Sequence, residues 1–126
     1  MHHKALWPLT KTANRGFRGY PLATVAFYGP DDRRASKVAV AIVPTDGAEP
    51  TELKRWFADD YDVRNDAEIA AAIGAFADEH GAKTIVMADR IIGCPHEEGV
   101  DYPDGQKCPS CPFWATRDRW SGAVLH

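Results

Sequence analysis

Two runs of nearly continuous apolar residues, 20–29 (YPLATVAFYG) and 36–44 (SKVAVAIVP), dominate the first third of the chain. Their β-branched and aromatic side chains predict two strands. The segment between them, GPDDRRA, supplies glycine, proline and aspartate for a turn. Because apolar residues occupy almost every position, we expect both faces of this hairpin to be at least partly covered.

A short helix is predicted over residues 49–60 (EPTELKRWFADD). Pro50 falls in its first turn, where the missing proline N–H has no cost. Leu53, Trp56 and Phe57 follow the i, i+3, i+4 spacing that puts side chains on one helical face. The pattern therefore favours an amphipathic helix after the hairpin.

A longer helix is predicted over residues 65–81 (NDAEIAAAIGAFADEHG). Asn65 and Glu68 have the spacing of a capping box, which satisfies two backbone N–H groups at the start of a helix. Gly81 fits the left-handed position at which many helices end. The apolar residues that recur on one face are Ile69, Ile73 and Phe76.

A third strand is predicted over residues 83–89 (KTIVMAD), ending at Asp89. The predicted order is β-β-α-α-β, followed by a cysteine-rich loop and a tail. Helices that link strands favour an α/β (α+β) fold, a small mixed sheet with helices packed on it. A length of 126 residues suits one core. We expect a basic arm over 1–19 and a single domain over 20–126 that includes a zinc loop over 93–112.

The composition is that of a folded protein, with 44% hydrophobic and 26% charged residues. No apolar run has the length of a secretory signal core or of a membrane span. We therefore expect a cytoplasmic protein of bacterial type with no membrane partner. Thiols stay reduced in that compartment, so clustered cysteines are metal ligands or redox groups there more often than disulfides.

The net charge of −3 divides unevenly, into +4 over residues 1–22, which contain no acid, and −7 over the rest. Aromatic residues lie between the cations, so the basic arm could contact a phosphate backbone and stack on bases. The alternative is a solvated arm whose aromatic side chains pack on the domain, which agrees better with the acidic remainder. The cations concerned are Lys4, Lys11, Arg15 and Arg18.

All three cysteines and one histidine lie near the end of the sequence, in the pattern C-x-H, eleven residues, C-x-x-C. Cys94 and His96 project to the same side of an extended backbone, which the proline between them favours. Cys108 and Cys111 flank a proline-containing turn, in which two thiolates separated by two residues can bind one ion. A YPDG turn at 102–105 brings the two halves together.

These four side chains form a Cys3His set, which suits Zn2+ in a closed tetrahedral site. Iron and copper are less favoured alternatives. Binding a structural zinc contributes about 10–16 kcal/mol, comparable with the whole stability of a domain. A metal could therefore order a loop that has few apolar residues. We assign Cys94, His96, Cys108 and Cys111 to a metal site and no residue to catalysis.

The segments DRIIGCPHEEGVDYP, CPSCPFW and RDRW resemble those of a small family of uncharacterised bacterial proteins. The likeness extends to YPLATVAFYGPDDRRASKVAV. It implies no activity, since that family has no assigned function, but it implies that the cysteine and histidine cluster is a family feature. CPSC also resembles one knuckle of a zinc ribbon. Pro112 stands where a ribbon has glycine, and C-x-H replaces the second C-x-x-C, so we expect a ribbon-like loop appended to the domain.

Two alternatives use the CPSC motif for other chemistry. It resembles the glutaredoxin redox motif, but only fifteen residues follow Cys111, too few for the rest of that fold. The HEE and CPSC segments also resemble the zinc deaminase signature H-x-E…P-C-x-x-C. Lys107 replaces the expected proline, only nine residues separate Glu98 from Cys108, and Cys94 would have no role. Both interpretations are weaker than a structural zinc site.

A third alternative is hydrolysis at the metal. A catalytic zinc has three protein ligands, an open position for water and a nearby carboxylate base. Glu97 or Glu98 could be that base if one cysteine stayed off the metal. Asp89 lies at a predicted strand end, where ligands bind in open α/β sheets. Alternatively, these acids and Asp101 are solvated, or they hydrogen-bond the loop amides and the free ring nitrogen of His96.

The sequence thus favours a small zinc-binding protein that acts as a binding or adaptor module. We expect a protein partner, contacted by the aromatic and arginine-rich tail, because Trp, Tyr and Arg dominate interfaces. A nucleic acid contacted by the basic arm is a variant of this interpretation. The alternative is a metal-dependent hydrolase or nuclease that uses the acids beside the zinc loop. The tail residues concerned are Phe113, Trp114, Arg117, Arg119 and Trp120.

Overall fold

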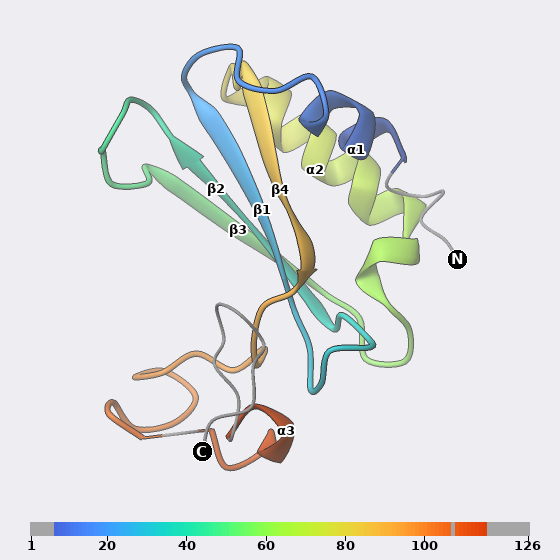
Figure 1. Ribbon diagram of the computed structural model, residues 1–126, viewed down its shortest axis with the longest axis vertical. Coiled ribbons are helices and arrows are strands. Elements are labelled where there is room, and N and C mark those ends of the chain that lie inside the picture. Colours follow the sequence, from blue (N-terminus) through green and yellow to red (C-terminus); the bar gives the residue numbers. More distant parts are fainter. Residues whose placement is uncertain (1–6, 107, 116–126) are drawn as a thin grey trace.

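The computed structural model describes residues 7–106 and 108–115. Four strands form one sheet, two helices lie on it, and a loop with a short third helix follows (Figure 1). The elements are α1 (Trp7–Ala13), β1 (Leu22–Tyr28), β2 (Lys37–Val43), β3 (Glu52–Phe57), a 3-10 helix (Val63–Asn65), α2 (Ala67–Glu79), β4 (Thr84–Ile91) and α3 (Pro112–Ala115). No helix of this part of the chain has the length and apolarity that crossing a bilayer requires.

The sheet is mixed, with the strand order β3-β2-β1-β4. β1 pairs antiparallel with β2, and β2 antiparallel with β3, whereas β1 and β4 run parallel. A parallel pair cannot be closed by a tight turn, so the chain reaches β4 only after passing through β2, β3 and α2. The predicted α/β (α+β) fold with a small mixed sheet is confirmed.

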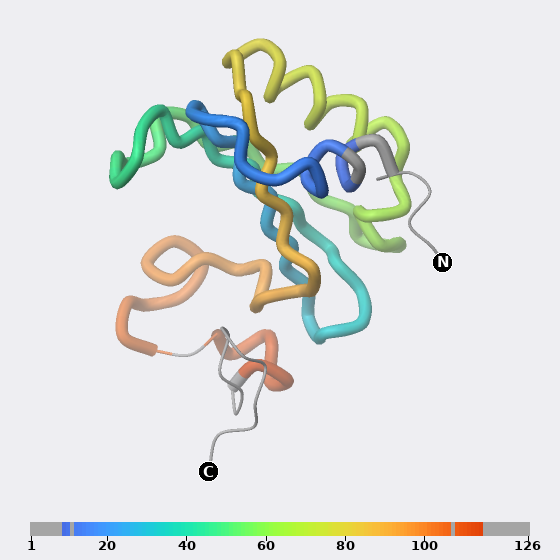
Figure 2. Tube along the Cα trace, turned by 45° about the horizontal axis from the view of Figure 1, so that its top comes forward, coloured from blue at the N-terminus to red at the C-terminus, as the bar shows by residue number. Residues whose placement is uncertain are grey.

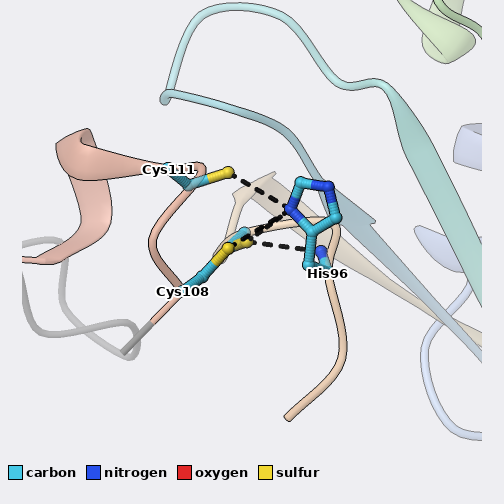
Figure 3. Close-up of side chains that lie close together, drawn as sticks. His96, Cys108 and Cys111 are labelled. Atoms are coloured by element: carbon cyan, nitrogen blue, oxygen red, sulfur yellow. Dashed lines mark hydrogen bonds between the residues drawn. The ribbon is translucent and has the colours of Figure 1, made fainter. Parts of the chain in front are cut away.

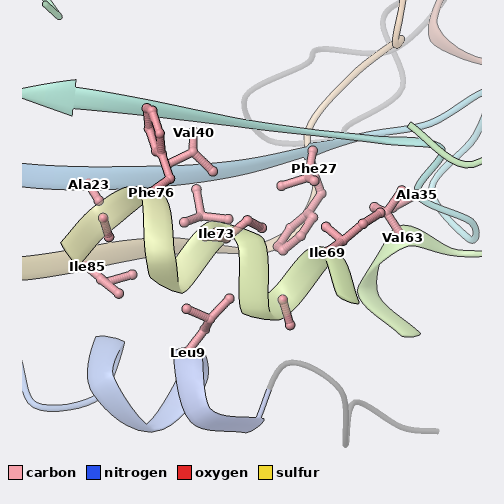
Figure 4. Close-up of a cluster of buried hydrophobic side chains, with 14 of the residues drawn as sticks. Leu9, Ala23, Phe27, Ala35, Val40, Val63, Ile69, Ile73, Phe76 and Ile85 are labelled. Atoms are coloured by element: carbon pink, nitrogen blue, oxygen red, sulfur yellow. The ribbon is translucent and has the colours of Figure 1, made fainter. Parts of the chain in front are cut away.

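The two longer helices cover one face of the sheet and enclose the core (Figure 4). Alternate residues of β1 and β2 point toward them, since side chains of a strand alternate between its faces. The loop after β4 lies on the other side of the sheet (Figure 2). The largest fully buried side chains of the core are those of Val25, Val38, Val40, Val63, Ile73 and Ile91.

Part of the basic arm belongs to this packing. Helix α1 lies within residues 1–19, and its Leu9 is buried in the core. Beyond the helix, the Arg18 N–H donates to the Thr84 hydroxyl at 2.8 Å. Arg15 and Arg18 are exposed, while Lys4 lies outside the described residues. The described part of the arm is therefore held on the sheet by α1 and by this hydrogen bond.

The helix predicted over 49–60 is wrong, because Glu52–Phe57 forms strand β3. It pairs with β2 along its whole length. In so short a segment the spacing of three apolar residues fits either element, and the backbone groups on the open edge of β2 decide between them. Trp56 faces the core beside the Phe76 ring, whereas Leu53 and Phe57 lie on the opposite face and are exposed.

The predicted capping box at Asn65 and Glu68 is displaced by one residue. Asn65 ends the 3-10 helix, and Asp66 caps α2, its carboxylate accepting from the Glu68 and Ile69 N–H groups at 2.9 and 3.0 Å. Glu68 consequently lies in the first turn of the helix instead of reaching back to its cap. The predicted stop at Gly81 is confirmed by its φ of 66°.

The position of the cap gives a stability prediction. We expect Asp66→Ala to lower the free energy of unfolding by about 0.5–2 kcal/mol, because two N–H groups of α2 lose their acceptor. Asp66→Asn keeps an acceptor oxygen and should be nearly neutral. Asn65→Ala should cost less than Asp66→Ala, and urea denaturation at neutral pH measures all three. Equal losses at positions 65 and 66 would contradict this assignment.

The same cap predicts a pH dependence. A hydrogen bond from the Tyr61 hydroxyl, with the N–H groups of Ile69 and Glu68, lowers the pKa of Asp66. A carboxyl whose pKa is lowered by folding stabilises the protein above its unfolded pKa of about 4 and loses that effect as the pH falls through the folded value. The stability difference between wild type and Asp66→Ala should therefore shrink below about pH 4.

Candidate metal centre

The candidate metal centre is built on the chain that leaves β4. Beyond Ile91 the backbone stays tied to the end of β1, since the Ile92 N–H donates to the Phe27 carbonyl and the Gly29 N–H donates to the Gly93 carbonyl, both at 2.9 Å. These bonds fix Cys94, which is buried, at the base of the loop. The first ligand therefore occupies a position set by the sheet.

The two halves of the motif converge as their spacing predicts. Cys94, His96, Cys108 and Cys111 place one ligand atom each within 4.8 Å of one another. The His96 Nδ1 atom lies 3.3, 3.4 and 3.5 Å from the Sγ atoms of Cys94, Cys108 and Cys111 (Figure 3). These four side chains form a candidate metal site.

The distances match the size of a zinc ion. Tetrahedral Zn2+ has bonds of about 2.3 Å to sulfur and 2.0–2.1 Å to nitrogen, so a bound nitrogen and sulfur lie about 3.6 Å apart. The three Nδ1–Sγ separations are only slightly shorter than this. Three thiols and an imidazole at this spacing can hold a tetrahedral ion that favours sulfur and nitrogen ligands.

The electrostatics of the cluster favour a cation among its ligands. Burial raises the pKa of the Cys94 thiol, and the neighbouring Cys111 and Cys108 thiols raise it further, although the His96 N–H donates to its sulfur. Burial also raises the pKa of Cys111, and the charge of Cys108 adds to the effect. Three thiolates cannot share this space without a positive charge between them. All three cysteines are free of disulfides.

A buried lysine connects the loop to the sheet. Lys37, whose side chain is 5% exposed, donates from Nζ to the Glu97 carboxylate at 2.8 Å and to the Pro95 carbonyl at 3.0 Å. Arg55 of β3 donates to the same carboxylate at 2.9 Å. The hydrogen bond from Lys37, together with Arg55, lowers the pKa of Glu97. The residue that follows His96 is thereby fixed to two strands.

The remaining acids of the loop stabilise its turns. Glu98 accepts from the Gly105 N–H at 2.6 Å, and Asp101 accepts from the Glu97 N–H at 2.7 Å. These contacts agree with the expectation that the acids of the loop hydrogen-bond its backbone amides. Both carboxylates are thus engaged by backbone N–H groups of the loop.

Asp89 lies apart from the metal ligands. Strand β4 continues to Ile91, so Asp89 is inside the strand and not at its end. It lines a cavity of about 270 Å³ together with Asn14 and Arg64. A different cavity, of about 620 Å³, is lined by His96 and Cys111. The arrangement expected for a hydrolase, with Asp89 beside the metal, is not what the described residues form.

The end of the described chain packs back on the sheet. Trp114 donates from Nε1 to the Gly29 carbonyl at 2.8 Å and packs against the core. Phe113 lies against it, with the ring centroids 4.9 Å apart. Of the tail residues expected to contact a partner, Trp114 therefore has a structural role. Arg117, Arg119 and Trp120 lie outside the described residues.

Lys37, Arg55 and Trp114 were not predicted to support the site. The sequence does indicate that Lys37 is unusual, because it is the one charged residue in the apolar run 36–44. A cation there requires a partner once the strand is buried. The partner itself could not be identified, because Glu97 lies sixty residues away and the fold alone brings the two together.

Comparison of the chain with protein-family models, with curated proteins and with solved structures found no match. The resemblance to a bacterial family drawn from the CPHEEG and CPSCPFW segments stays a prediction.

The ion pairs of Glu97 give a second stability prediction. Glu97→Gln should lower the free energy of unfolding by about 1–3 kcal/mol, because the buried Lys37 ammonium loses its carboxylate. Glu98→Gln is the matched control. Its amide oxygen can still accept from Gly105, so the change should stay within about 0.5 kcal/mol. Urea denaturation with added Zn2+ compares the two, and equal effects would contradict a special role for Glu97.

Proposed function

We propose that this protein is a binding module whose C-terminal loop is organised by one structural Zn2+ ion, bound by Cys94, His96, Cys108 and Cys111. The observation that carries the proposal is the convergence of four ligand atoms within 4.8 Å of one another. Sulfur and imidazole ligands at tetrahedral spacing favour zinc over magnesium or calcium, which prefer oxygen. A reducing compartment such as the cytoplasm, in which thiols remain available, belongs to the same proposal.

A structural role fits the donor set better than a catalytic one. Four protein ligands fill a tetrahedral zinc, so no position remains for a reactive water. The nearby carboxylates are also engaged, Glu97 with Lys37 and Glu98 with the Gly105 amide. The role of the ion is therefore to hold the loop in place.

The loop requires such an ion because it buries little apolar surface. Among the described residues between 93 and 111, the buried side chains are those of Cys94, Tyr102 and Cys111. Two of these three are ligands themselves. A zinc contribution of about 10–16 kcal/mol would exceed what such burial supplies.

The loop forms a surface with the face of the sheet that the helices leave open. The cavity of about 620 Å³ lies between them, with His96 and Glu97 on the loop side and Arg55 and Phe57 on the strand side. Its size is that of a binding cleft. Zinc binding would position one wall of this cleft, which couples metal loading to recognition of a protein partner.

Metal binding is tested by native mass spectrometry of the untagged protein before and after chelation. We expect one zinc per chain, and X-ray absorption that fits three sulfur ligands and one nitrogen. Cys108→Ser and His96→Ala should each abolish zinc retention at micromolar protein. His80→Ala is the control, because His80 lies at the end of α2 beside Phe76 and should leave zinc in place. Identical folding without any metal would contradict the proposal.

Chelation should loosen the C-terminal third selectively. With the ion removed, three thiols remain in a loop with little apolar burial, so amide hydrogen exchange should accelerate over residues 93–111. Strands β1 and β2 lie in the core and should keep their protection. Hydrogen exchange monitored by mass spectrometry provides the comparison. Uniform acceleration would indicate that the metal supports the whole fold, and no acceleration would indicate that the loop does not depend on it.

A further inference from the structure

The outer edge of β3 is open within the described part of the chain. β3 is the first strand of the sheet order and pairs only with β2 there. The Ala58 N–H donates to the Ser36 carbonyl, which identifies 58 and 36 as a hydrogen-bonded pair. Such pairs alternate in antiparallel ladders. Leu53, Arg55 and Phe57 therefore direct their backbone N–H and C=O groups away from β2.

The same three residues present their side chains on the open face of the sheet, because they lie opposite Ala41, Ala39 and Lys37. Leu53 is 50% exposed and Phe57 61% exposed. Exposed apolar residues beside an unpaired edge are the features by which strands recognise extended peptides.

A cleft lies beside this edge. Arg55 and Phe57 line the cavity of about 620 Å³, and Val100 of the zinc loop, 77% exposed, lines its other side. A peptide paired with β3 would direct alternate side chains to this face, where the cavity could receive one of them. Backbone pairing would thus supply affinity and the cavity would supply selectivity.

The middle of β3 is positively charged. Lys54 places its Nζ over two aromatic rings, and none of the described carboxylates forms an ion pair with it. Arg55 shares the single Glu97 carboxylate with Lys37, so two cations face one anion. Asp59 and Asp101 also line the cavity, which balances the charge of the cleft but not that of the strand edge.

The charge pattern argues against a second copy of the chain as the occupant. In an antiparallel dimer, β3 of one copy would pair with β3 of another, and residues with outward backbone groups would have to lie opposite each other. Two registers meet this condition over most of the strand. One places Arg55 opposite Arg55, and the other places Lys54 opposite Lys54. Like charges directly opposite each other destabilise a strand pair, and lysine on an edge strand discourages self-association.

We propose that the outer edge of β3 binds an extended segment of a partner protein by strand addition. Acidic residues of this segment lie opposite Lys54 and Arg55, and apolar residues lie opposite Leu53 and Phe57. The preferred antiparallel sequence is apolar, any residue, acidic, acidic, apolar. The proposal rests on the proposed function in one respect, because the zinc-held loop supplies the second wall of the cleft.

The test uses the zinc-loaded, full-length protein and a fluorescein-labelled peptide of about ten residues with the core Val-Thr-Glu-Glu-Val. Fluorescence anisotropy should show saturable binding below about 1 mM. Replacing both glutamates by lysine should weaken binding at least about fivefold, because two attractive cross-strand pairs become repulsive. N-methylation of alternate residues, which removes the donors facing β3, should abolish binding.

Two variants locate the binding edge. Leu53→Pro removes an outward N–H without breaking a bond to β2, a position where edge strands tolerate proline, and should weaken peptide binding at least about fivefold. Lys54→Glu should shift the preference toward the lysine peptide. Thermal unfolding and zinc content measured on both variants show whether they remain folded and loaded.

The proposal is overturned if folded, zinc-loaded protein binds none of these peptides, or binds the glutamate, lysine and N-methylated peptides equally. A dimer in light scattering that Leu53→Pro dissociates would overturn it too, by identifying a second copy as the occupant. Failure of the zinc proposal is recognised separately, by a protein that retains no metal in native mass spectrometry. Peptide binding by such a metal-free protein would support strand addition alone.

Discussion

The C-terminal loop is arranged around the convergence of three sulfurs and one imidazole nitrogen on a space the size of one metal ion. The thiols of Cys94 and Cys111 are buried, and burial raises the pKa of both. A divalent cation reverses this tendency, because it binds thiolates and neutralises their charge. In the function that we propose, the C-terminal loop, which has little apolar surface of its own, would gain from such an ion the stability that the core supplies elsewhere.

The sheet prepares one side of the site before any metal binds. Hydrogen bonds at the end of β1 place Cys94, while Lys37 and Arg55 hold Glu97, one residue beyond the ligand His96. Because the buried Lys37 bonds one carboxylate and one carbonyl of the loop, the backbone around His96 has little freedom to move. Loop and strands therefore stabilise one another, and the cleft between loop and sheet takes its shape from both.

Strand β3 is the element that the local sequence pattern did not predict. Six residues with apolar side chains at three positions fit a helical face as well as a strand, and the choice went to the strand because β2 offered unpaired backbone groups. A helix would have covered the sheet, whereas the strand extends it and leaves Leu53 and Phe57 beside a cleft.

The sequence alone determined that strands β1, β2 and β4 and the long helix exist, that the fold is a small mixed α/β (α+β) one, and which side chains are candidate ligands, although β4 runs to Ile91 and does not end at Asp89. The candidate ligands are Cys94, His96, Cys108 and Cys111. Each of these follows from local periodicity, glycine and proline positions, or the spacing of ligands along a few residues. Tertiary structure alone decided that 52–57 is a strand, that Lys37 bonds Glu97, and that Asp89 lies away from the ligands. These depend on pairing between segments distant in the chain, which local patterns do not encode.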